Sequence, residues 1–514
     1  MAIKTFAAIN IGSYELTMKI FEHSPRIGMR EIDHIRHKID LGANMYDKGT
    51  IPYTNVEEMC RVLGEFVGIM NAYHVEEYRA YGTSAMRETK NALLILEQIR
   101  IKTGLTVTVV ANSEQRFLDY KSILFKGNPF KKQMEKGTAI VDIGGGSIQI
   151  SLFEQGTLVT TQNIRLGVLR LRDKVFKLKP SQDQIEGLVD ELIMNQLFAF
   201  KKLYLKEREI TTMSIVDDYV SVLYPREHIL QEFSDEIKVE QFYEFVASLK
   251  AKGKEQLSRE YQVDDDTLIL LYMAALIVKK IANILNVQTI WASGATLCDG
   301  IAYEYAHDNR CIPNLHNFEQ DILHSALQMN KKYEVSKKRA EADEANAITI
   351  FKAMRRIHGL GERELLLLRL AAILHDTGKY ISLSLVGECS YSIITGTEII
   401  GLSHKERIMV ACMAKYNHVD FEYYNMMSKV HPIDQETYLT ISKLTAILRV
   451  ASALNKSHKQ KFKEVKATLK DNQLFIRVMT HENIILERGL MEERSKLFED
   501  VFSVTISLSQ KRNV

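Results

Sequence analysis

The first residues of the chain carry the hydrophobic pattern of a strand, a tight turn and a second strand. An apolar run at 6–9 is interrupted at 10–13 (NIGS), after which apolar and polar residues alternate over 16–20. Alternation with a period of two is typical of a β-strand with one buried face. The pattern predicts a β-hairpin whose turn contains Gly12 and Ser13.

The same pattern returns at 139–154, where an apolar strand leads into the turn IGGGS and a second alternating segment. When the two segments are laid over each other without a gap, Asn10 matches Asp142 and Gly12 matches Gly144. Two copies of one βα domain, each starting with a hairpin whose turn faces a shared cleft, explain this match. The alternative is a pair of unrelated hairpins that both need glycine in their turns.

Periodicity along the rest of the chain predicts an α/β first part and a helical second part. A polar, proline-containing connector at 309–317 marks the boundary between them. In the first part we expect strands at 78–81 and 107–110, helices at 56–73, 90–102 and 267–285, and a strand, turn and helix over 289–305. In the second part we expect helices at 333–358, 362–375, 405–416 and 438–455, then short strands with a helix at 490–502. The predicted domains are 1–125, 126–305, 310–460 and a small α+β cap at 461–514.

Composition supports a multidomain globular protein. The 514 residues are too many for one hydrophobic core, and 46% are hydrophobic. Lys and Arg (67) nearly balance Asp and Glu (65), which does not suggest a DNA-binding protein. The five cysteines are scattered without metal-site spacing, as expected for reduced thiols. No signal peptide and no uninterrupted apolar run of ~18 residues is present. We therefore expect a cytoplasmic protein without a membrane partner.

The second hairpin turn contains the clearest candidate for phosphate chemistry. Asp142 ends a strand, where its carboxylate can hold Mg²⁺ directly or through water. The three glycines that follow, Gly144, Gly145 and Gly146, let backbone amides approach phosphate oxygens without a Cβ in the way. A glycine-rich hairpin by itself is usually structural, but a pair of related hairpins favours a phosphate site.

Other residues carry less specific signals. Arg87 follows a strand near a predicted helix N-terminus, where amide donors and a guanidinium suit phosphate, although a lone arginine is usually a surface residue. Glu114 comes after the strand at 107–110, and its ordinary role would be to complement a helix dipole. His375 and Asp376 end a helix and offer two adjacent metal ligands, which need further ligands from neighbouring helices.

Together these motifs resemble the exopolyphosphatase/guanosine pentaphosphate phosphohydrolase (Ppx/GppA) family over essentially the whole chain. The matching segments are 8–13 (AINIGS), 82–87 (GTSAMR), 113–114 (SE), 141–147 (VDIGGGS), 166–171 (LGVLRL) and 374–376 (LHD). The resemblance implies two RNase H-like lobes of the actin-like ATPase fold, followed by a helical HD-type domain and the α+β cap. It also implies Mg²⁺-dependent attack of water on the terminal phosphoanhydride of inorganic polyphosphate or guanosine pentaphosphate (pppGpp). We further expect a homodimer.

The resemblance assigns roles to individual residues. Glu114 stands where the family has its general base, which accepts a proton from the attacking water. Asp142, with Asn10 in the first hairpin, stands at the Mg²⁺ position. The terminal phosphoryl group would be cradled by Gly12, Ser13, Arg87, Gly144, Gly145, Gly146 and Ser147.

This chain also departs from the family pattern around the phosphate site. Asn10 replaces the usual Asp of the first hairpin, and Gln149 replaces a Glu of the second. The family's pair of glutamates is reduced to Glu114 followed by Gln115. A Gly-Thr-Ser-Gly-Thr-like loop is missing, and 213–222 occupies that region with two aspartates at 217–218.

The helical domain departs from the pattern as well. Cys389 and Asn455 stand where metal ligands of an HD centre are expected. The sequence therefore predicts that this metal centre is lost and that the domain is structural or binds a polyanion.

The sequence is compatible with two functions. One is an active exopolyphosphatase or pentaphosphate phosphatase, favoured by Glu114, Asp142 and the glycines. The other is a regulatory protein that binds polyphosphate or an alarmone and has lost most catalysis, favoured by Asn10 and Gln149. Polyphosphate and pppGpp present the same terminal phosphoanhydride, so the sequence does not distinguish them as substrates.

Overall fold

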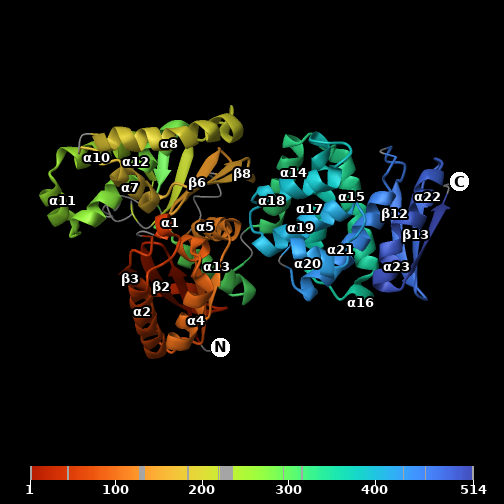
Figure 1. Cartoon of the computed structure of the whole chain (residues 1–514), viewed down its shortest axis with the longest axis horizontal. Helices are drawn as coiled ribbons and strands as arrows, with labels where there is room; N and C mark the ends of the chain where they lie inside the picture. The colour runs from red at the N-terminus through yellow and green to blue at the C-terminus, as the bar shows by residue number, and fades with distance from the viewer. Residues whose placement is uncertain are drawn as a thin grey trace. The chain divides into compact units, whose positions relative to one another are not determined.

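The computed structural model of the chain describes residues 3–42, 45–126, 134–181, 184–217, 219, 236–292, 294–313, 316–431, 433–457 and 459–511. These residues form two compact units, 1–317 and 318–514 (Figure 1). The boundary falls at the end of the polar connector at 309–317.

The first unit begins with a five-stranded mixed sheet, which we call the sheet of lobe I. Its strand order is β3-β2-β1-β4-β5, with β1 antiparallel to β2 and parallel to β4. The strands are β1 (Lys4–Ile11), β2 (Glu15–Ser24), β3 (Gly28–Lys38), β4 (Glu77–Gly82) and β5 (Val107–Val109). The helices of this part are α1 (Met45–Lys48), α2 (Tyr53–Ala72), α3 (Ser84–Glu88), α4 (Ala92–Thr103) and α5 (Asn112–Lys126).

A second sheet, that of lobe II, repeats this topology. Its order is β10-β11-β9-β6-β7-β8, so β8-β7-β6-β9-β11 repeats the arrangement of lobe I and β10 is added at one edge. Its strands are β6 (Thr138–Ile143), β7 (Ile148–Glu154), β8 (Thr157–Ile164), β9 (Thr212–Asp217), β10 (Glu236–Lys238) and β11 (Thr289–Trp291). Its helices are α7 (Val168–Lys177), α8 (Ile185–Phe200) with the π-helical turn η2 (Lys201–Leu205), α10 (Val239–Ala251), α11 (Lys254–Tyr261) and α12 (Asp265–Leu285). The equivalent strand orders confirm the duplication that the two hairpins predicted.

Helix α13 (Leu297–Asp308) does not pack on lobe II, although the predicted domain boundary at 305 places most of it there. It contacts α5, β1 and β2 instead. Leu297, Ile301 and Tyr305 join Phe6 and Phe21 in one buried cluster on the face of the first sheet opposite α2 and α4. The chain therefore returns to lobe I after completing lobe II. Apolar burial on both faces of β1 holds that sheet between two helical layers.

Helix α12 is the core helix of lobe II. By length and composition it could cross a membrane, but 72% of its most apolar 18-residue segment is buried inside the protein. Residues such as Leu271, Leu276 and Ile281 belong to the hydrophobic core of that lobe. Its apolar character is explained by this packing.

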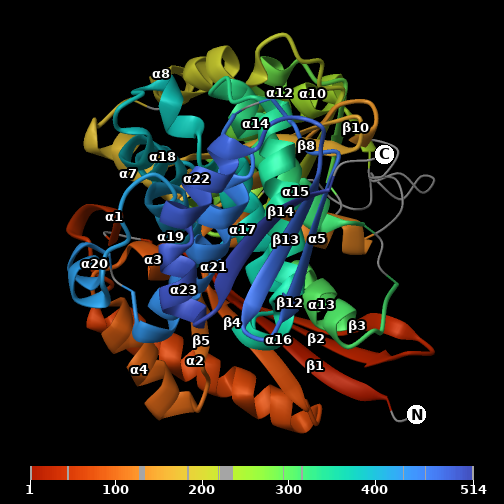
Figure 2. The same cartoon turned by 90° about the vertical axis from the view of Figure 1, so that its right-hand side faces the viewer.

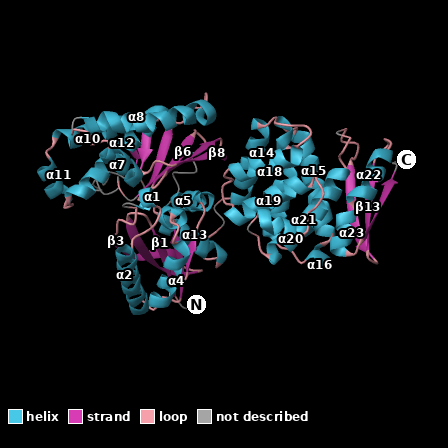
Figure 3. Ribbon diagram, in the orientation of Figure 1, coloured by secondary structure: helices cyan, strands magenta, loops and turns pink. Residues whose placement is uncertain are grey.

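The second unit is helical except for a sheet near its end (Figure 3). Its helices are α14 (Phe318–Lys332), α15 (Lys337–Ala353), α16 (Arg355–His358), α17 (Glu362–Leu374), the 3₁₀ turn η4 (Thr377–Tyr380), α18 (Val386–Gly396), α19 (His404–Tyr416), α20 (Tyr424–Val430) and α21 (Gln435–Ala453). The three strands β12 (Glu464–Lys470), β13 (Gln473–Met479) and β14 (Thr505–Lys511) run side by side in Figure 2, with α22 (Ile485–Arg494) and α23 (Lys496–Phe502) between β13 and β14 in the chain. The single helix expected at 490–502 is thus two helices that meet at Ser495.

Candidate active site

The two hairpins have the same turn geometry at matching positions. In the first, the amide of Gly12 donates to the carbonyl of Glu15 (2.9 Å), and in the second, the amide of Gly144 donates to that of Ser147 (3.0 Å). Asn10 and Asp142 are each the second-to-last residue of the first strand of their hairpin, where they pair with Thr17 and Gln149 of the second strand. The sequence match between the segments therefore extends to their hydrogen bonds.

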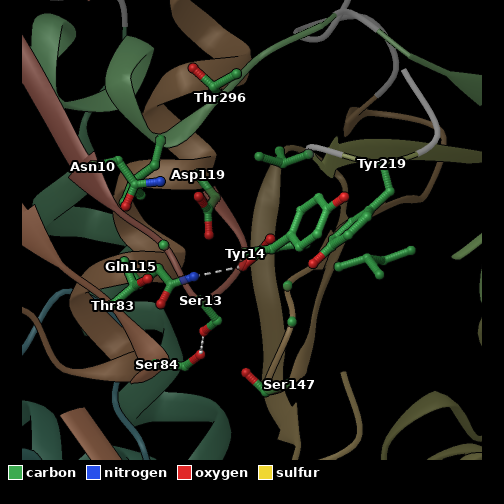
Figure 4. A pocket seen from close by; sticks show the side chains of 17 residues that line it. Asn10, Ser13, Tyr14, Thr83, Ser84, Gln115, Asp119, Ser147, Tyr219 and Thr296 are labelled. Atoms are coloured by element: carbon green, nitrogen blue, oxygen red, sulfur yellow. Dashed lines mark hydrogen bonds between the residues drawn. The ribbon is translucent and has the colours of Figure 1, made fainter. Parts of the chain in front are cut away.

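Both turns open onto one cavity of about 50 Å³. A buried water needs only ~10–15 Å³, so the cavity has room for several waters or a small polar group. Figure 4 shows side chains from both lobes around it. The lining residues are Asn10, Gly12, Ser13, Tyr14, Thr83, Ser84, Gln115, Asp119, Asp142, Ile143, Gly144, Gly145, Ser147, Val216, Tyr219, Thr296 and Leu297.

Helix α7 fixes the direction of the peptide groups in the glycine turn. Val168 donates its amide to the carbonyl of Gly144, and Leu169 donates to that of Gly145, at 3.0 and 2.9 Å. Gly167 allows this approach, since a Cβ there would lie 2.3 Å from the carbonyl oxygen of Gly144. Because the carbonyls are engaged by α7, the turn can present its amides to an anion. This contact explains the segment LGVLRL at 166–171.

Gly146 has a different role from the one predicted for it. It is not among the cavity-lining residues, and a Cβ at this position would lie 2.2 Å from the hydroxyl of Tyr46. That hydroxyl belongs to a triangle with Ser13 and Ser84, whose oxygen atoms are 2.7 to 2.9 Å apart. Gly146 therefore permits close contact between the glycine turn and lobe I, while the serines line the cavity.

The carboxylate of Asp142 is held by two glutamine amides. Gln115 on α5 donates from Nε2 to Oδ2 of Asp142 (2.9 Å), and Gln149 on β7 donates to the same oxygen (3.0 Å). Arg87 lies outside the lining residues. It donates to the carbonyl of Val110 (2.6 Å) and to Oε1 of Gln115 (3.3 Å). Arg87 thus acts on the site through Gln115, rather than from the predicted position against the phosphoryl group.

Glu114 is also absent from the cavity lining. It lies in the first turn of α5, where its Oε2 accepts the amide of Ala111 at 2.8 Å. A carboxylate in this position satisfies a backbone donor and complements the helix dipole. The residues of α5 that do line the cavity are Gln115 and Asp119. The structure thus places the predicted general base at a helix end and brings two other side chains of that helix into the site.

The oxygen atoms around the cavity fit the Mg²⁺ that the sequence led us to expect. Asn10 is 8% exposed, and its Oδ1 has no hydrogen-bond partner among the described residues. A buried acceptor of this kind is costly unless a donor or cation satisfies it. Asp142, which lines the same cavity, adds a carboxylate, and oxygen ligands are those that Mg²⁺ prefers.

Two tyrosines that were not predicted from the sequence, Tyr14 and Tyr219, also line the cavity. The rings of Tyr14 and Tyr219 are stacked with centroids 5.4 Å apart, and the hydroxyl of Tyr14 lies 2.9 Å from Oγ1 of Thr267. Burial raises the pKa of Tyr14 above its ordinary value. Tyr219 comes from the region that replaces the family's threonine- and glycine-rich loop. Its neighbour at 218 lies outside the described residues, and the side chain at 217 is likewise not described.

Comparison with known proteins shows the family of the chain. The profile of the Ppx/GppA phosphatase family matches residues 19–309, and the profile of domain III of Ppx/GppA phosphatases matches residues 323–495. The chain belongs to the Ppx/GppA phosphatase family.

Individual relatives are distant. Guanosine-5'-triphosphate,3'-diphosphate pyrophosphatase of Aliivibrio fischeri (strain MJ11) is 21% identical over 461 residues, which are 87% of this chain and 86% of the relative. The protein of the same name from Vibrio atlanticus (strain LGP32) is 21% identical over 491 residues, or 91% and 90% of the two chains. The crystal structure of an exopolyphosphatase from Cytophaga hutchinsonii has a TM-score of 0.51 at 16% identity and covers 59% of this chain and 98% of that one. This likeness shows that the two lobes have the actin-like fold of Ppx/GppA proteins.

A clasp of charged side chains joins the lobes beside the glycine turn of this Ppx/GppA protein. Glu88, at the end of α3, accepts hydrogen bonds from Arg165 (2.7 Å) and Arg170 (2.8 Å) of lobe II. Arg170 also donates to the carbonyl of Gly146 (2.9 Å). Burial alone would raise the pKa of Glu88, but the hydrogen bonds and charges of Arg170 and Arg165 hold it below its usual value. The clasp links lobe I to lobe II beside the glycine turn.

In domain III, the predicted dyad His375 and Asp376 lies beside His418. One possible ligand atom from each of the three lies within 4.8 Å of the others, which is close enough for a shared metal ion. His418 is far from the dyad in sequence and was not predicted. Asn455, which replaces an expected ligand, donates from Nδ2 to Oδ1 of the buried Asp343 (3.0 Å) and so belongs to the same cluster.

Side-chain cations already surround the carboxylates of this cluster. Arg339 places Nε 2.8 Å from Oδ2 of Asp376, and Lys379 donates to the same oxygen at 2.8 Å. Burial would lower the pKa of His375, yet the carboxylates of Asp376 and Asp343 raise it to about 9. Arg339 and Lys379 together carry as many positive charges as Asp376 and Asp343 carry negative ones. This arrangement supports the prediction that the metal centre is lost, which stays a prediction.

Proposed function

We propose that this Ppx/GppA protein is a phosphoanhydride hydrolase that releases orthophosphate from the end of inorganic polyphosphate or pppGpp. The observation that carries the proposal is the meeting of two equivalent hairpin turns at one polar cavity, with Asn10 and Asp142 at matching positions of the two lobes. The names of the relatives, pyrophosphatases of a guanosine pentaphosphate and an exopolyphosphatase, support this substrate class.

The terminal phosphoryl group would lie between the two turns. The amide of Gly145, which lines the cavity, donates to no other residue in the described parts of the chain, so it is open to phosphate oxygens. The hydroxyls of Ser13 and Ser147 line the same space and can donate further hydrogen bonds. Phosphoryl transfer depends mainly on positioning and charge stabilisation, which is what such a cradle supplies.

Asp142 and Asn10 would hold Mg²⁺. When bound, the ion neutralises charge on the phosphate oxygens as the bond to the leaving group breaks. Asp142 is oriented for this task by Gln115 and Gln149, since both amides donate to its Oδ2. Asn10 contributes a neutral oxygen where a carboxylate would bind the ion more firmly.

A second function is favoured by the same glutamines. The two amides hold the carboxylate of Asp142 without adding charge, which suits a site that binds a polyanion and turns it over slowly or not at all. In that case the protein would be a regulatory sensor of polyphosphate or of an alarmone.

The two functions are separated by measuring orthophosphate release and ligand binding in the same samples. Polyphosphate and pppGpp are each incubated with the full chain, with and without Mg²⁺. A hydrolase releases orthophosphate in proportion to time and enzyme, and the release stops when Mg²⁺ is chelated. A sensor binds one of the two ligands by calorimetry and releases no orthophosphate at any Mg²⁺ concentration.

A further inference from the structure

Helix α5 turns one narrow face toward the cavity. Gln115 and Asp119 are four residues apart, so they lie one above the other on the same side of the helix. Both line the cavity, and Glu114, rotated away by one residue, does not. The hydrogen bond from the amide of Ala111 keeps Glu114 at the helix end. A water molecule in the cavity would therefore meet Gln115 and Asp119, rather than Glu114.

Among the described residues that line the cavity, Asp119 and Asp142 are the two with carboxylates. Asp142 sits at the Mg²⁺ position and is bound by two glutamine amides. Gln115 is an amide and cannot take up a proton at neutral pH. The remaining titratable groups are the phenols of Tyr14 and Tyr219, and burial makes Tyr14 a weaker acid still.

Asp119 is placed where a proton acceptor would be useful. Its side chain is 2% exposed, and Figure 4 shows its carboxylate directed into the cavity between Asn10 and Gln115. The position is rigid, because α5 packs closely against α13 through Leu118 and Ile301. A buried, fixed carboxylate next to the reacting group satisfies the geometric requirement for general base catalysis.

We propose that Asp119 is the general base of this protein. The inference rests on the proposed hydrolase function. In the step, the oxygen of a water molecule forms a bond to the terminal phosphorus while a proton of that water passes to the carboxylate of Asp119. The bond between the terminal phosphorus and the bridging oxygen breaks, and its electron pair leaves with the shortened phosphate chain. Orthophosphate is the other product.

The test compares two isosteric changes on the same helix, Asp119→Asn and Glu114→Gln. Each removes one carboxylate and keeps the size of the side chain. We expect Asp119→Asn to lower kcat by ~10²–10⁴, with KM and the Mg²⁺ concentration for half-maximal rate unchanged. Glu114→Gln should keep kcat within about threefold, because an amide oxygen can still accept the amide of Ala111. Circular dichroism and thermal melting in both variants establish that they are folded.

Several outcomes would overturn the role of Asp119. If kcat is unchanged in Asp119→Asn, or falls only in Glu114→Gln, the base lies elsewhere. If the variant instead needs much more Mg²⁺ and recovers full rate when it is supplied, Asp119 is a metal ligand. If Asp119→Asn unfolds, the conservative variant Asp119→Glu is tested instead. Measurable but slower turnover by a folded Asp119→Glu chain supports Asp119 as the general base, and turnover equal to wild type contradicts it. Absence of orthophosphate release from the wild-type chain defeats the hydrolase function itself, whereas release that survives in Asp119→Asn defeats the role of Asp119 alone.

Discussion

Gln115 Nε2 lies 2.9 Å from Oδ2 of Asp142, so a helix of lobe I and a hairpin of lobe II meet in a hydrogen bond at the centre of the site. An amide can make this bond to an ionised carboxylate without a cation, whereas a second carboxylate could not. The neutral side chains of Gln115 and Gln149 thus hold the carboxylate of Asp142 in place without a bound cation. The site is arranged to hold its shape at low Mg²⁺.

Restoring acidic residues should strengthen Mg²⁺ binding. In the double variant Asn10→Asp with Gln149→Glu, the cation gains charged oxygen ligands, which it prefers. We expect the Mg²⁺ concentration for half-maximal phosphate release to fall by about tenfold and the rate to rise. Without Mg²⁺ the new glutamate faces Asp142, so the melting temperature should drop and recover when Mg²⁺ is added. A double variant that is no faster at any Mg²⁺ concentration would favour the sensor function.

Close contact at Gly146 should be essential for activity. In Gly146→Ala the new Cβ would lie 2.2 Å from the Tyr46 hydroxyl and 2.7 Å from Oγ of Ser84, which forces the glycine turn away from lobe I. Overpacking of this kind costs ~1–3 kcal/mol, and phosphate release should fall by more than tenfold. The matched control is Gly187→Ala, since nothing lies within 4 Å of a Cβ there. Equal activity in the two variants would show that the lobes do not need this contact.

The charge cluster around His375 should make stability depend on pH. Its pKa is about 9 in the folded chain and ~6.5 when unfolded. A raised pKa contributes stability that is fully present below about pH 6.5 and is lost as the pH rises through about 9. We expect the free energy of unfolding, measured with urea, to decline by on the order of 1–3 kcal/mol over that interval. His375→Gln should flatten the decline, while the control His481→Gln, at an exposed position, should keep it. An equal slope in wild type and His375→Gln would show that His375 is not protonated in the folded chain.

We predict that Arg339 excludes a metal ion from the cluster around Asp376 in domain III. Its guanidinium lies 2.8 Å from the carboxylate of Asp376, beside His375 and His418. Elemental analysis of the purified chain should find no stoichiometric transition metal, and Arg339→Ala should bind Zn²⁺ or Mn²⁺ more tightly than wild type by calorimetry. One or two tightly held metal ions in the wild-type chain would contradict the prediction and revive a second metal centre at His375 and Asp376.

Local patterns in the sequence predicted the duplicated hairpins, because strand alternation and glycine turns are encoded within a few residues. Which face of α5 points into the cavity could not be predicted in the same way. Glu114 and Gln115 differ by one position, and which of them points into the cavity depends on how α5 packs against α13. The return of α13 to lobe I, which buries Leu297 and Ile301 against β1, is a contact between distant segments and has no local signature. His418 was missed for the same reason, since only the packing of α19 and the turn after it brings it to His375.

Tyr14 and Tyr219 were also beyond prediction from the sequence. Their importance comes from contacts across the cavity, and tyrosines in apolar surroundings usually belong to the core. The family resemblance could not correct this, because the region around Tyr219 departs from the family pattern. The role of Glu114 was likewise implied by the family resemblance. A sequence motif does not say which face of α5 points into the cavity, whereas the structure does.

We propose above that the protein hydrolyses a terminal phosphoanhydride in the cavity between the hairpins with the help of Asp142. The most direct measurement is orthophosphate release from polyphosphate and from pppGpp by wild-type chain and by Asp142→Asn, each over a range of Mg²⁺ concentrations. We predict Mg²⁺-dependent release by the wild type from at least one of the two substrates, reduced by at least about a hundredfold in Asp142→Asn. Tight binding of polyphosphate or pppGpp by the wild type, with no release of orthophosphate at any Mg²⁺ concentration, would contradict the claim.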